Sequence, residues 1–388
     1  MSFDKVKHQK GAVRALRAAV GSDRLPHAFL FAGPRGVGKG LAARELAKVL
    51  LCETPRDVGT PRPPTARSRC ADGDAGADGR DSCDACSSCE RVDRGTHPDV
   101  YWFRKEPDRN DFRLLLVARR EKSPDRVVTE SVVLSPMEGP RTVTVLDDAE
   151  LMNAEAANAL LKSLEEPARH AVLILLCADV SRLPATILSR CQWVRFRPLP
   201  DAFVAERVRA LLPPEDGAVS DAEIAYVSRF AGGSIERARA LVGSGLWDLK
   251  RAVVPLLAEM EESAALDIAE RIAAWSRERA KDERVTSESR EETALRREAA
   301  RTALAAVASA LRDALVLATV GEETPALVNA DQPEAIRALA AWPGEALLRA
   351  VGLLADAQRH ISRYVHTELA TENALLQVSR LRAVRAGA

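Results

Sequence analysis

A chain of 388 residues is too long for a single compact unit, so two or three domains are expected. Its 56 basic and 56 acidic side chains balance, which argues against binding nucleic acid through charge alone, although one basic surface within a larger assembly stays open. The start, MSFDKVKHQK, lacks a signal-peptide pattern, and the longest apolar run, at 171–178, is far too short to span a membrane. We therefore expect a cytoplasmic protein without membrane contacts.

The first elements predict a phosphate-binding loop. Apolar positions at 12–20 have helical spacing, 27–33 is a short apolar strand, and 41–52 again has the period of a helix. Between strand and helix lies GPRGVGKG, in which backbone N–H groups and the lysine can surround phosphate oxygens. A plain glycine-rich turn is the alternative. The residues concerned are Gly33, Pro34, Arg35, Gly36, Val37, Gly38, Lys39 and Gly40, the last standing where a Mg²⁺-binding hydroxyl is usual.

Residues 53–82 are rich in Pro, Gly, Asp and Arg, and we interpret them as an insertion with little to bury. Four cysteines in and after it predict a structural zinc site, because three thiols at two-residue spacings plus one upstream can close a tetrahedral shell. Buried or redox cysteines are the alternative. Cys52 is assigned to the preceding apolar helix instead. The predicted ligands are Cys70, Cys83, Cys86 and Cys89, within a zinc-binding segment at about 66–92.

A second buried strand, at 142–146, ends in Asp147 and Asp148. An acid at the end of a strand beside a phosphate loop commonly serves Mg²⁺, a role for Asp147, while Asp148 stands where hydrolases place a longer glutamate. A helix at 153–167 and a third strand at 171–178 follow. Apolar strands alternating with helices predict an α/β domain with a parallel sheet covered on both faces.

After a short helical stretch, Ser-Arg-Cys places Arg190 before another strand; by spacing alone it is an ordinary surface arginine. From about residue 200 the pattern is helical, with a charged stretch at 276–301 that is typical of a solvated helix face or a linker.

Taken together, these motifs resemble those of bacterial DNA polymerase III clamp-loader subunits, and within that family the delta-prime type, with the gamma/tau ATPase as a close cousin. The resemblance covers residues 1 to about 247 well. It is carried, in this order, by RLPHAFLFAGPRGVGKG, the cysteine cluster, GTHPDV, LDDAELMNAEAANALLKSLEEP and LPATILSRC.

The resemblance implies a P-loop AAA+ domain at 1–200, a small helical lid at 201–247 and a helical collar at 248–388. It implies a five-membered ring with gamma/tau and delta subunits, which opens the sliding clamp and places it on primed DNA, as part of a DNA-directed DNA polymerase holoenzyme. By the same resemblance, Arg190 acts in trans on the ATP of a neighbouring subunit.

Several positions depart from the hydrolysing pattern of the family. Besides Gly40 and Asp148, the sensor position after the third strand holds Cys177 or Ala178, and the lid arginine is replaced by Glu236, with Arg237 next to it. These departures favour a non-hydrolysing subunit in which ATP or ADP binds weakly. An active ATPase of the gamma type is the main alternative, and a DNA-binding zinc protein is a weaker one.

Overall fold

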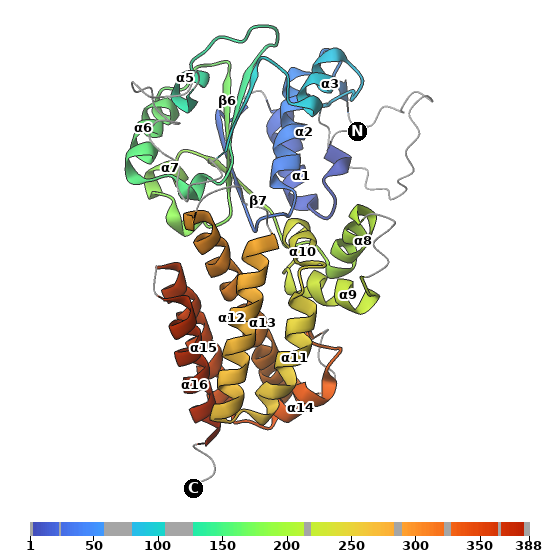
Figure 1. Ribbon diagram of the computed structural model, residues 1–388. Coiled ribbons are helices and arrows are strands. Elements are labelled where there is room, and N and C mark those ends of the chain that lie inside the picture. Colours follow the sequence, from blue (N-terminus) through green and yellow to red (C-terminus); the bar gives the residue numbers. More distant parts are fainter. Residues whose placement is uncertain are drawn as a thin grey trace. The chain divides into compact units, whose positions relative to one another are not determined.

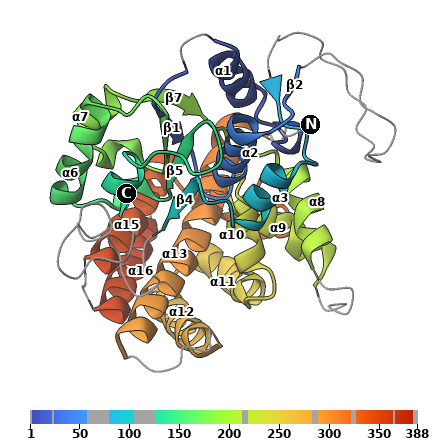
Figure 2. The same ribbon diagram turned by 90° about the horizontal axis from the view of Figure 1, so that it is seen from above.

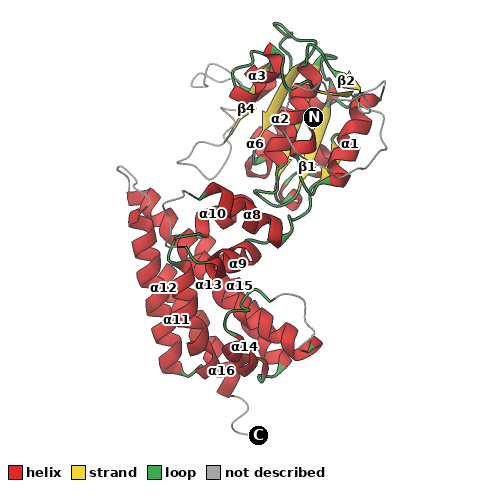
Figure 3. Cartoon of the chain, turned by 90° about the vertical axis from the view of Figure 1, so that its right-hand side faces the viewer, coloured by secondary structure: helices red, strands yellow, loops and turns green. Residues whose placement is uncertain are grey.

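The computed structural model describes residues 3–22, 25–57, 80–104, 127–212, 219–282, 289–321, 327–363 and 366–383. The chain divides into two compact units, Met1–Leu199 and Pro200–Ala388. The first unit is α/β and the described part of the second is helical (Figures 1 and 3).

A five-stranded parallel sheet forms the centre of the first unit, in the order β4-β5-β6-β1-β7. The three middle strands are buried along their whole length, as expected of apolar runs covered on both faces. The strands are β1 (Ala28–Ala32), β4 (Val100–Phe103), β5 (Thr142–Leu146), β6 (Ala171–Cys177) and β7 (Gln192–Arg195).

Helices lie on both faces of this sheet (Figures 1 and 2). On one side are α1 (Lys10–Gly21) and α2 (Lys39–Leu51), and on the other α5 (Val128–Ser131), α6 (Ala154–Glu165) and α7 (Ala185–Leu188). The predicted α/β class with a parallel sheet and two covered faces is therefore confirmed. The remaining elements of this unit are α3 (Ser87–Arg94), the short strands β2 (Arg56–Asp57) and β3 (Arg80–Asp81), and the 3-10 helices η1 (Phe3–Lys5), η2 (Ala149–Leu151) and η3 (Val180–Arg182).

Parallel pairing places the carboxyl ends of four strands at one edge of the sheet. Ala32 at the end of β1 pairs with Cys177 at the end of β6, while Phe103 at the end of β4 pairs with Leu146 at the end of β5. In open α/β sheets this edge is where ligands bind. The residues that follow these strand ends form the phosphate-loop site described below.

Most of the predicted insertion, at 58–79, lies outside the described residues, but its two ends are described. β2 and β3 pair in antiparallel fashion, Arg56 opposite Asp81 and Asp57 opposite Arg80. This pairing brings the chain before the insertion next to the chain after it. Closing a long loop costs little more than closing a short one, so the length of the insertion does not prevent this contact.

The second unit is built on one continuous apolar core, to which α9–α16 contribute. Long helices are stabilised by packing an apolar face rather than by their own propensity. The boundary near residue 247 between a lid and a collar stays a prediction. The helices are α8 (Asp201–Leu211), α9 (Asp221–Phe230), α10 (Ile235–Leu241), α11 (Leu246–Glu259), α12 (Glu262–Asp282), α13 (Ser289–Val320), α14 (Pro333–Ala340), α15 (Gly344–Ser362) and α16 (Thr367–Ala383).

Among the described residues, one helix is long and apolar enough to span a membrane, at Glu292–Val320 in α13; α14 and α15 pass the same test only if this bent pair is counted as one span. Core helices of water-soluble domains pass the same test, and Leu304, Val307, Ala310 and Leu311 on this helix are buried in the core of the second unit. The apolar composition of α13 is thus explained by its central place among the helices.

Candidate functional site

The glycine loop between β1 and α2 has the strand–loop–helix context that a phosphate-binding loop needs. Gly38 caps α2 in the left-handed region at φ 100°, and Gly36 is also left-handed at φ 69°. Such backbone angles turn successive N–H groups toward a common centre, where the positive end of the helix adds to the attraction for an anion. The loop therefore has the backbone geometry of a phosphate cradle.

Lys39 is folded back onto the loop. Its Nζ donates hydrogen bonds to the carbonyl oxygens of Gly33 at 2.6 Å and Pro34 at 2.7 Å, and its side chain is buried. Burial lowers the pKa of Lys39, although Glu150, Asp147 and Asp148 oppose this shift. The ammonium group of Lys39 therefore lies at the glycine loop, where it could contact a bound phosphate, and in this structure it is hydrogen-bonded to loop carbonyls.

The acids after β5 lie at the same edge of the sheet, and each is matched by an arginine of this chain. Arg104, directly after β4, approaches Asp147 with Nε 3.3 Å from Oδ2. Arg35 in the glycine loop approaches Asp148 at 3.0 Å and Glu150 at 3.9 Å. The sequence did not predict Arg104 or Glu150 as site residues: the pairing of β4 with β5 places Arg104 here, and the turn at Asp148 into η2 places Glu150.

Glu150 is only 4% exposed and accepts a hydrogen bond from the backbone N–H of Ala178 at 3.2 Å. Cys177, the candidate sensor residue, is fully buried, and burial together with Glu150 raises the pKa of its thiol to about 12. A neutral, buried thiol is a weak donor to phosphate. In the second unit, Glu236, which the sequence analysis aligned with the lid arginine of the family, is exposed, and the guanidinium of Arg237 lies 4.9 Å from the ring centroid of Phe230.

Gly40 has room for a side chain. A Cβ at this position would lie 3.7 Å from the ring of Trp102 and 3.9 Å from Leu176, which are ordinary van der Waals contacts. We predict that Gly40→Thr folds normally and strengthens the Mg²⁺ dependence of nucleotide binding a few-fold without restoring turnover, because it supplies the missing hydroxyl. Titration with a fluorescent ADP analogue in Mg²⁺ and in EDTA measures this, and Gly40→Ala, which adds Cβ alone, is the matched control. Equal dependence in both variants would contradict the prediction.

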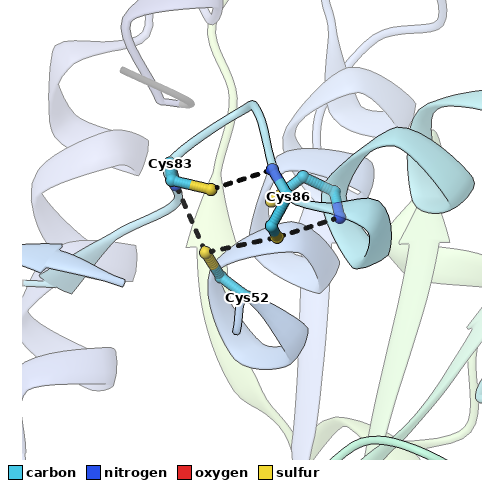
Figure 4. Close-up of side chains that lie close together, drawn as sticks. Cys52, Cys83 and Cys86 are labelled. Carbon is cyan, nitrogen blue, oxygen red and sulfur yellow. Dashed lines mark hydrogen bonds between the residues drawn. The ribbon is translucent and has the colours of Figure 1, made fainter. Parts of the chain in front are cut away.

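Four cysteines gather beside the C-terminus of α2, and one of them differs from the predicted set. The sulfur atoms of Cys52, Cys83, Cys86 and Cys89 all lie within 4.8 Å of one another. Figure 4 shows Cys52, Cys83 and Cys86, and the sulfur of Cys52 is 3.9 Å from that of Cys86. The predicted ligand Cys70 lies outside the described residues. Cys52, which the sequence analysis assigned to the helix, is instead the residue that follows its last turn and faces the other three.

The geometry of this cluster fits a tetrahedral metal ion. Four thiolates at the usual zinc–sulfur length lie about 3.8 Å apart, close to the spacing seen here. Backbone N–H groups point at the sulfurs: Cys83 donates to Cys52 at 3.3 Å, Cys86 donates to Cys83 at 3.2 Å, and Cys89 donates to Cys86 at 3.5 Å. Such N–H donors, at the start of α3, stabilise negative sulfur. Burial opposes ionisation of Cys83, but hydrogen bonds from Thr54, Ala85 and Cys86 outweigh it and lower its pKa to about 6.

A buried lysine ties the cysteine cluster to α2. The side chain of Lys48 is fully buried and its Nζ lies 2.7 Å from Glu45, 2.9 Å from Asp84 and 3.1 Å from Asp93. Asp84 belongs to the turn between Cys83 and Cys86. Burial alone would lower the pKa of Lys48, but Glu45 and Asp84 outweigh burial and raise it, so the lysine stays charged.

We predict that Lys48→Met lowers the free energy of unfolding by about 3 kcal/mol, because it leaves buried carboxylates without their main partner. The loss is expected at the low end of the usual range, since Lys5 also lies 3.4 Å from Asp84. Chemical denaturation measures it. Lys162→Met, at an exposed position of α6, is the control and is expected to change stability by less than about 0.5 kcal/mol. A similar effect of both substitutions would show that the buried network is unimportant.

Arg190 follows α7 and is partly exposed, with 36% of its side chain accessible. Its Nη1 donates to the carbonyl of Thr186 at 3.1 Å and to Oγ of Ser189 at 3.3 Å, while Nη2 donates to Glu165, the last residue of α6, at 2.8 Å. The guanidinium is therefore held at the surface by three acceptors, and a guanidinium has five N–H groups in all. It can still offer donors to a group outside this chain.

The sequence of this chain is similar to those of DNA polymerase III subunits. The family described as "DNA polymerase III, delta subunit" matches residues 8–200. The delta-prime subunit of DNA polymerase III from Pseudomonas aeruginosa is 34% identical over 228 residues, which cover 59% of this chain and 59% of that protein. The tau subunit from Salmonella typhimurium is 28% identical over 283 residues, which cover 72% of this chain and 39% of that protein.

The matched region thus spans less than two thirds of each of these relatives. Among solved structures, a gamma subunit-related protein from Thermotoga maritima aligns over 96% of this chain and 99% of its own, with 17% identity and a TM-score of 0.37.

Proposed function

Because this chain belongs to the DNA polymerase III clamp-loader family, we propose that it is a non-hydrolysing subunit of a clamp loader. In this role it joins gamma/tau and delta subunits in a five-membered ring in the cytoplasm. The ring opens the sliding clamp and places it on primed DNA. In this proposal the chain contributes a rigid AAA+ domain and Arg190 to the ring, and it does not itself hydrolyse ATP.

The loss of hydrolysis is inferred from the groups around the phosphate loop. Hydrolysis needs a metal held by a hydroxyl and an acid, and a water oriented by a second acid. Gly40 supplies no hydroxyl, and both Asp147 and Asp148 are paired with arginines of the same chain. The sensor position falls on Cys177, whose thiol is buried, or on Ala178, and neither is a good donor to phosphate. We therefore expect weak nucleotide binding and no turnover at this site.

Arg190 carries the positive part of the proposal. A guanidinium offers permanent charge and planar, paired donors, which suit a phosphoryl group on which charge develops during hydrolysis. Its exposure and its place after α7 leave it accessible to a neighbouring subunit. We propose that it reaches the γ-phosphate of ATP bound by that neighbour.

We propose that the metal of the cysteine cluster is Zn²⁺, held by Cys52, Cys83, Cys86 and Cys89. Zinc prefers tetrahedral thiolate sites, and four protein ligands leave no open position for chemistry. The role is therefore structural: the metal would fix α3 against α2. Metal analysis of the purified protein tests this, and full zinc content in a Cys86→Ser/Cys89→Ser variant would contradict it.

The proposed role is tested by co-expression with gamma/tau and delta subunits, followed by native mass measurement of the complex. We expect this chain in a defined assembly, and an assembled ring that hydrolyses ATP only through the other subunits. Failure of this chain to enter any such complex would refute the proposal.

An active ATPase of the gamma type is the second candidate, favoured by the intact glycine loop and by Lys39. Turnover by the isolated chain separates the two functions. Steady ATP hydrolysis that is abolished by Lys39→Ala would establish the ATPase and exclude the non-hydrolysing role.

A further inference from the structure

We propose that His97 is a positioning residue of the cysteine cluster: through Ser88 it holds the end of α2, which Cys52 follows, against α3. This inference rests on the metal site proposed above and names a group that keeps its ligands together. His97 belongs to the segment GTHPDV, which contains neither a cysteine nor a residue of the phosphate loop. Its side chain lies outside the cluster, but the hydrogen bonds that start from it end next to a ligand.

Ser88, in the first turn of α3, contacts both chain neighbours of Cys52. Its Oγ donates a hydrogen bond to the carbonyl oxygen of Leu51 at 2.8 Å, and its backbone N–H donates to the carboxylate of Glu53 at 3.2 Å. Leu51 and Glu53 flank Cys52 in the chain. The helix that supplies two ligands therefore holds, from both sides, the residue that supplies a third.

The imidazole of His97 orients the hydroxyl of Ser88. Its Nδ1 accepts a hydrogen bond from the backbone N–H of Asp99 at 3.1 Å, so in the neutral ring the proton lies on Nε2. Nε2 is 3.1 Å from Oγ of Ser88 and donates to it, which leaves the single hydroxyl proton of the serine for Leu51. Ser88 and His97 are 3% and 4% exposed, and burial lowers the pKa of His97, although Asp99 opposes this shift.

His97 is in turn fixed to the sheet through Asp99, which is 1% exposed. The carboxylate of Asp99 accepts hydrogen bonds from the backbone N–H groups of residues 137–139, at 2.5, 3.0 and 2.7 Å. Its carbonyl oxygen accepts from the N–H of Val143 in β5 at 2.9 Å. Burial opposes ionisation of Asp99, but the three N–H groups outweigh it and lower its pKa. The chain of contacts thus runs from the central sheet to the end of α2.

This arrangement prepares the cluster for a metal ion. Ligands that are already held in place lose less freedom on binding, and removing a group that orients ligands commonly weakens a metal site by about 10- to 100-fold. Without the imidazole, the hydroxyl of Ser88 is free to turn away from Leu51, and the end of α2 is no longer held at a fixed distance from α3. The loss is therefore expected in metal affinity, and not only in the stability of the fold.

The test is titration of the full-length chain with Co²⁺ under reducing conditions, after its own metal has been removed. Co²⁺ enters tetrahedral thiolate sites, and its absorption reports both occupancy and geometry. We expect His97→Leu and Ser88→Ala to bind Co²⁺ about tenfold or more weakly than the parent. His97→Gln, whose side-chain amide can still donate to Ser88, is expected to stay within about threefold of the parent.

Ser131→Ala is the matched control. Ser131 is 1% exposed, its Oγ donates to the carbonyl of Val128 at 2.7 Å, and it lies 3.0 Å from Oγ1 of Thr144. It is thus another buried serine with two partners, on the other side of the sheet from α2 (Figure 1). Its loss should lower the free energy of unfolding much as Ser88→Ala does, yet leave the affinity for Co²⁺ unchanged.

Two results would overturn the inference: a parent-like affinity for Co²⁺ in folded His97→Leu and Ser88→Ala, or an equal loss of affinity in Ser131→Ala. If His97→Leu does not fold, Ser88→Ala decides. A parent protein that shows no thiolate–cobalt absorption would instead refute the metal site itself. The clamp-loader role is judged separately, by assembly with the other subunits, so each failure gives a different result.

Discussion

Arg190→Lys is expected to leave this chain folded and the ring assembled, yet to lower ATP hydrolysis at the neighbouring site by about 10³-fold, the low end for an arginine supplied in trans. Lysine keeps the charge but loses the planar, paired donors. The fold should be unaffected, because the ion pair with Glu165 is exposed and exposed pairs contribute about 1 kcal/mol or less. The measurement is clamp- and DNA-stimulated ATP hydrolysis of the reconstituted complex, together with clamp loading.

Lys39→Ala in this chain is the comparison for that experiment. It removes the lysine of the chain's own phosphate loop and is expected to change the same rates only slightly, because that site contributes no turnover. If Lys39→Ala proves the more damaging of the two, this chain is a motor and the proposed role is wrong. If neither substitution matters, Arg190 does not act in trans.

Cys52→Ser is expected to remove the bound zinc, whereas Cys70→Ser should keep it. Structural zinc contributes about 10 kcal/mol or more of local folding free energy, so its loss should unfold α3 and the turn before it. The sheet should persist, because its buried strands do not depend on the metal. Metal analysis gives the zinc content, and limited proteolysis locates the unfolded segment.

The two serine variants are matched, since each removes a single thiol from the same part of the chain. The reverse result, zinc lost from Cys70→Ser and kept by Cys52→Ser, would restore the ligand set predicted from the sequence. Retention of zinc by both variants would show that the metal is held elsewhere.

The elements of the first unit that could be predicted from the sequence are those with long, regular apolar patterns. β1, β5 and β6 are buried throughout; β1 and β6 are continuous apolar runs, β5 alternates threonine with valine, and α2 and α6 have a clear helical period. β4 was not predicted, because it has only four residues and is followed by a charged segment. Without β4 in place, the sequence gives no reason to set Arg104 beside Asp147.

The cysteine cluster shows a second limit of prediction from sequence: spacing along the chain does not identify a ligand that a tertiary contact brings in. Spacing along the chain predicted Cys83, Cys86 and Cys89 as a group, and the structure brings these three together. The fourth partner depends on a tertiary contact, since the pairing of β2 with β3 returns the chain to the end of α2 across the insertion. Spacing along the chain favoured Cys70, whereas among the described residues the fourth sulfur of the cluster belongs to Cys52.

Gly33, the first glycine of the phosphate loop, is required by packing as well as by any role in phosphate binding. Its φ is 156°, and a Cβ there would lie 2.4 Å from the carbonyl oxygen of Phe196 and 2.9 Å from its Cβ. No other residue fits without moving the segment that follows β7. Selection for a well-packed sheet would therefore conserve the first glycine of the motif even in a chain that never meets a nucleotide. Position 40 lacks this constraint, because a Cβ there would make only ordinary van der Waals contacts, so packing alone would keep the glycine at position 33 and not the one at position 40.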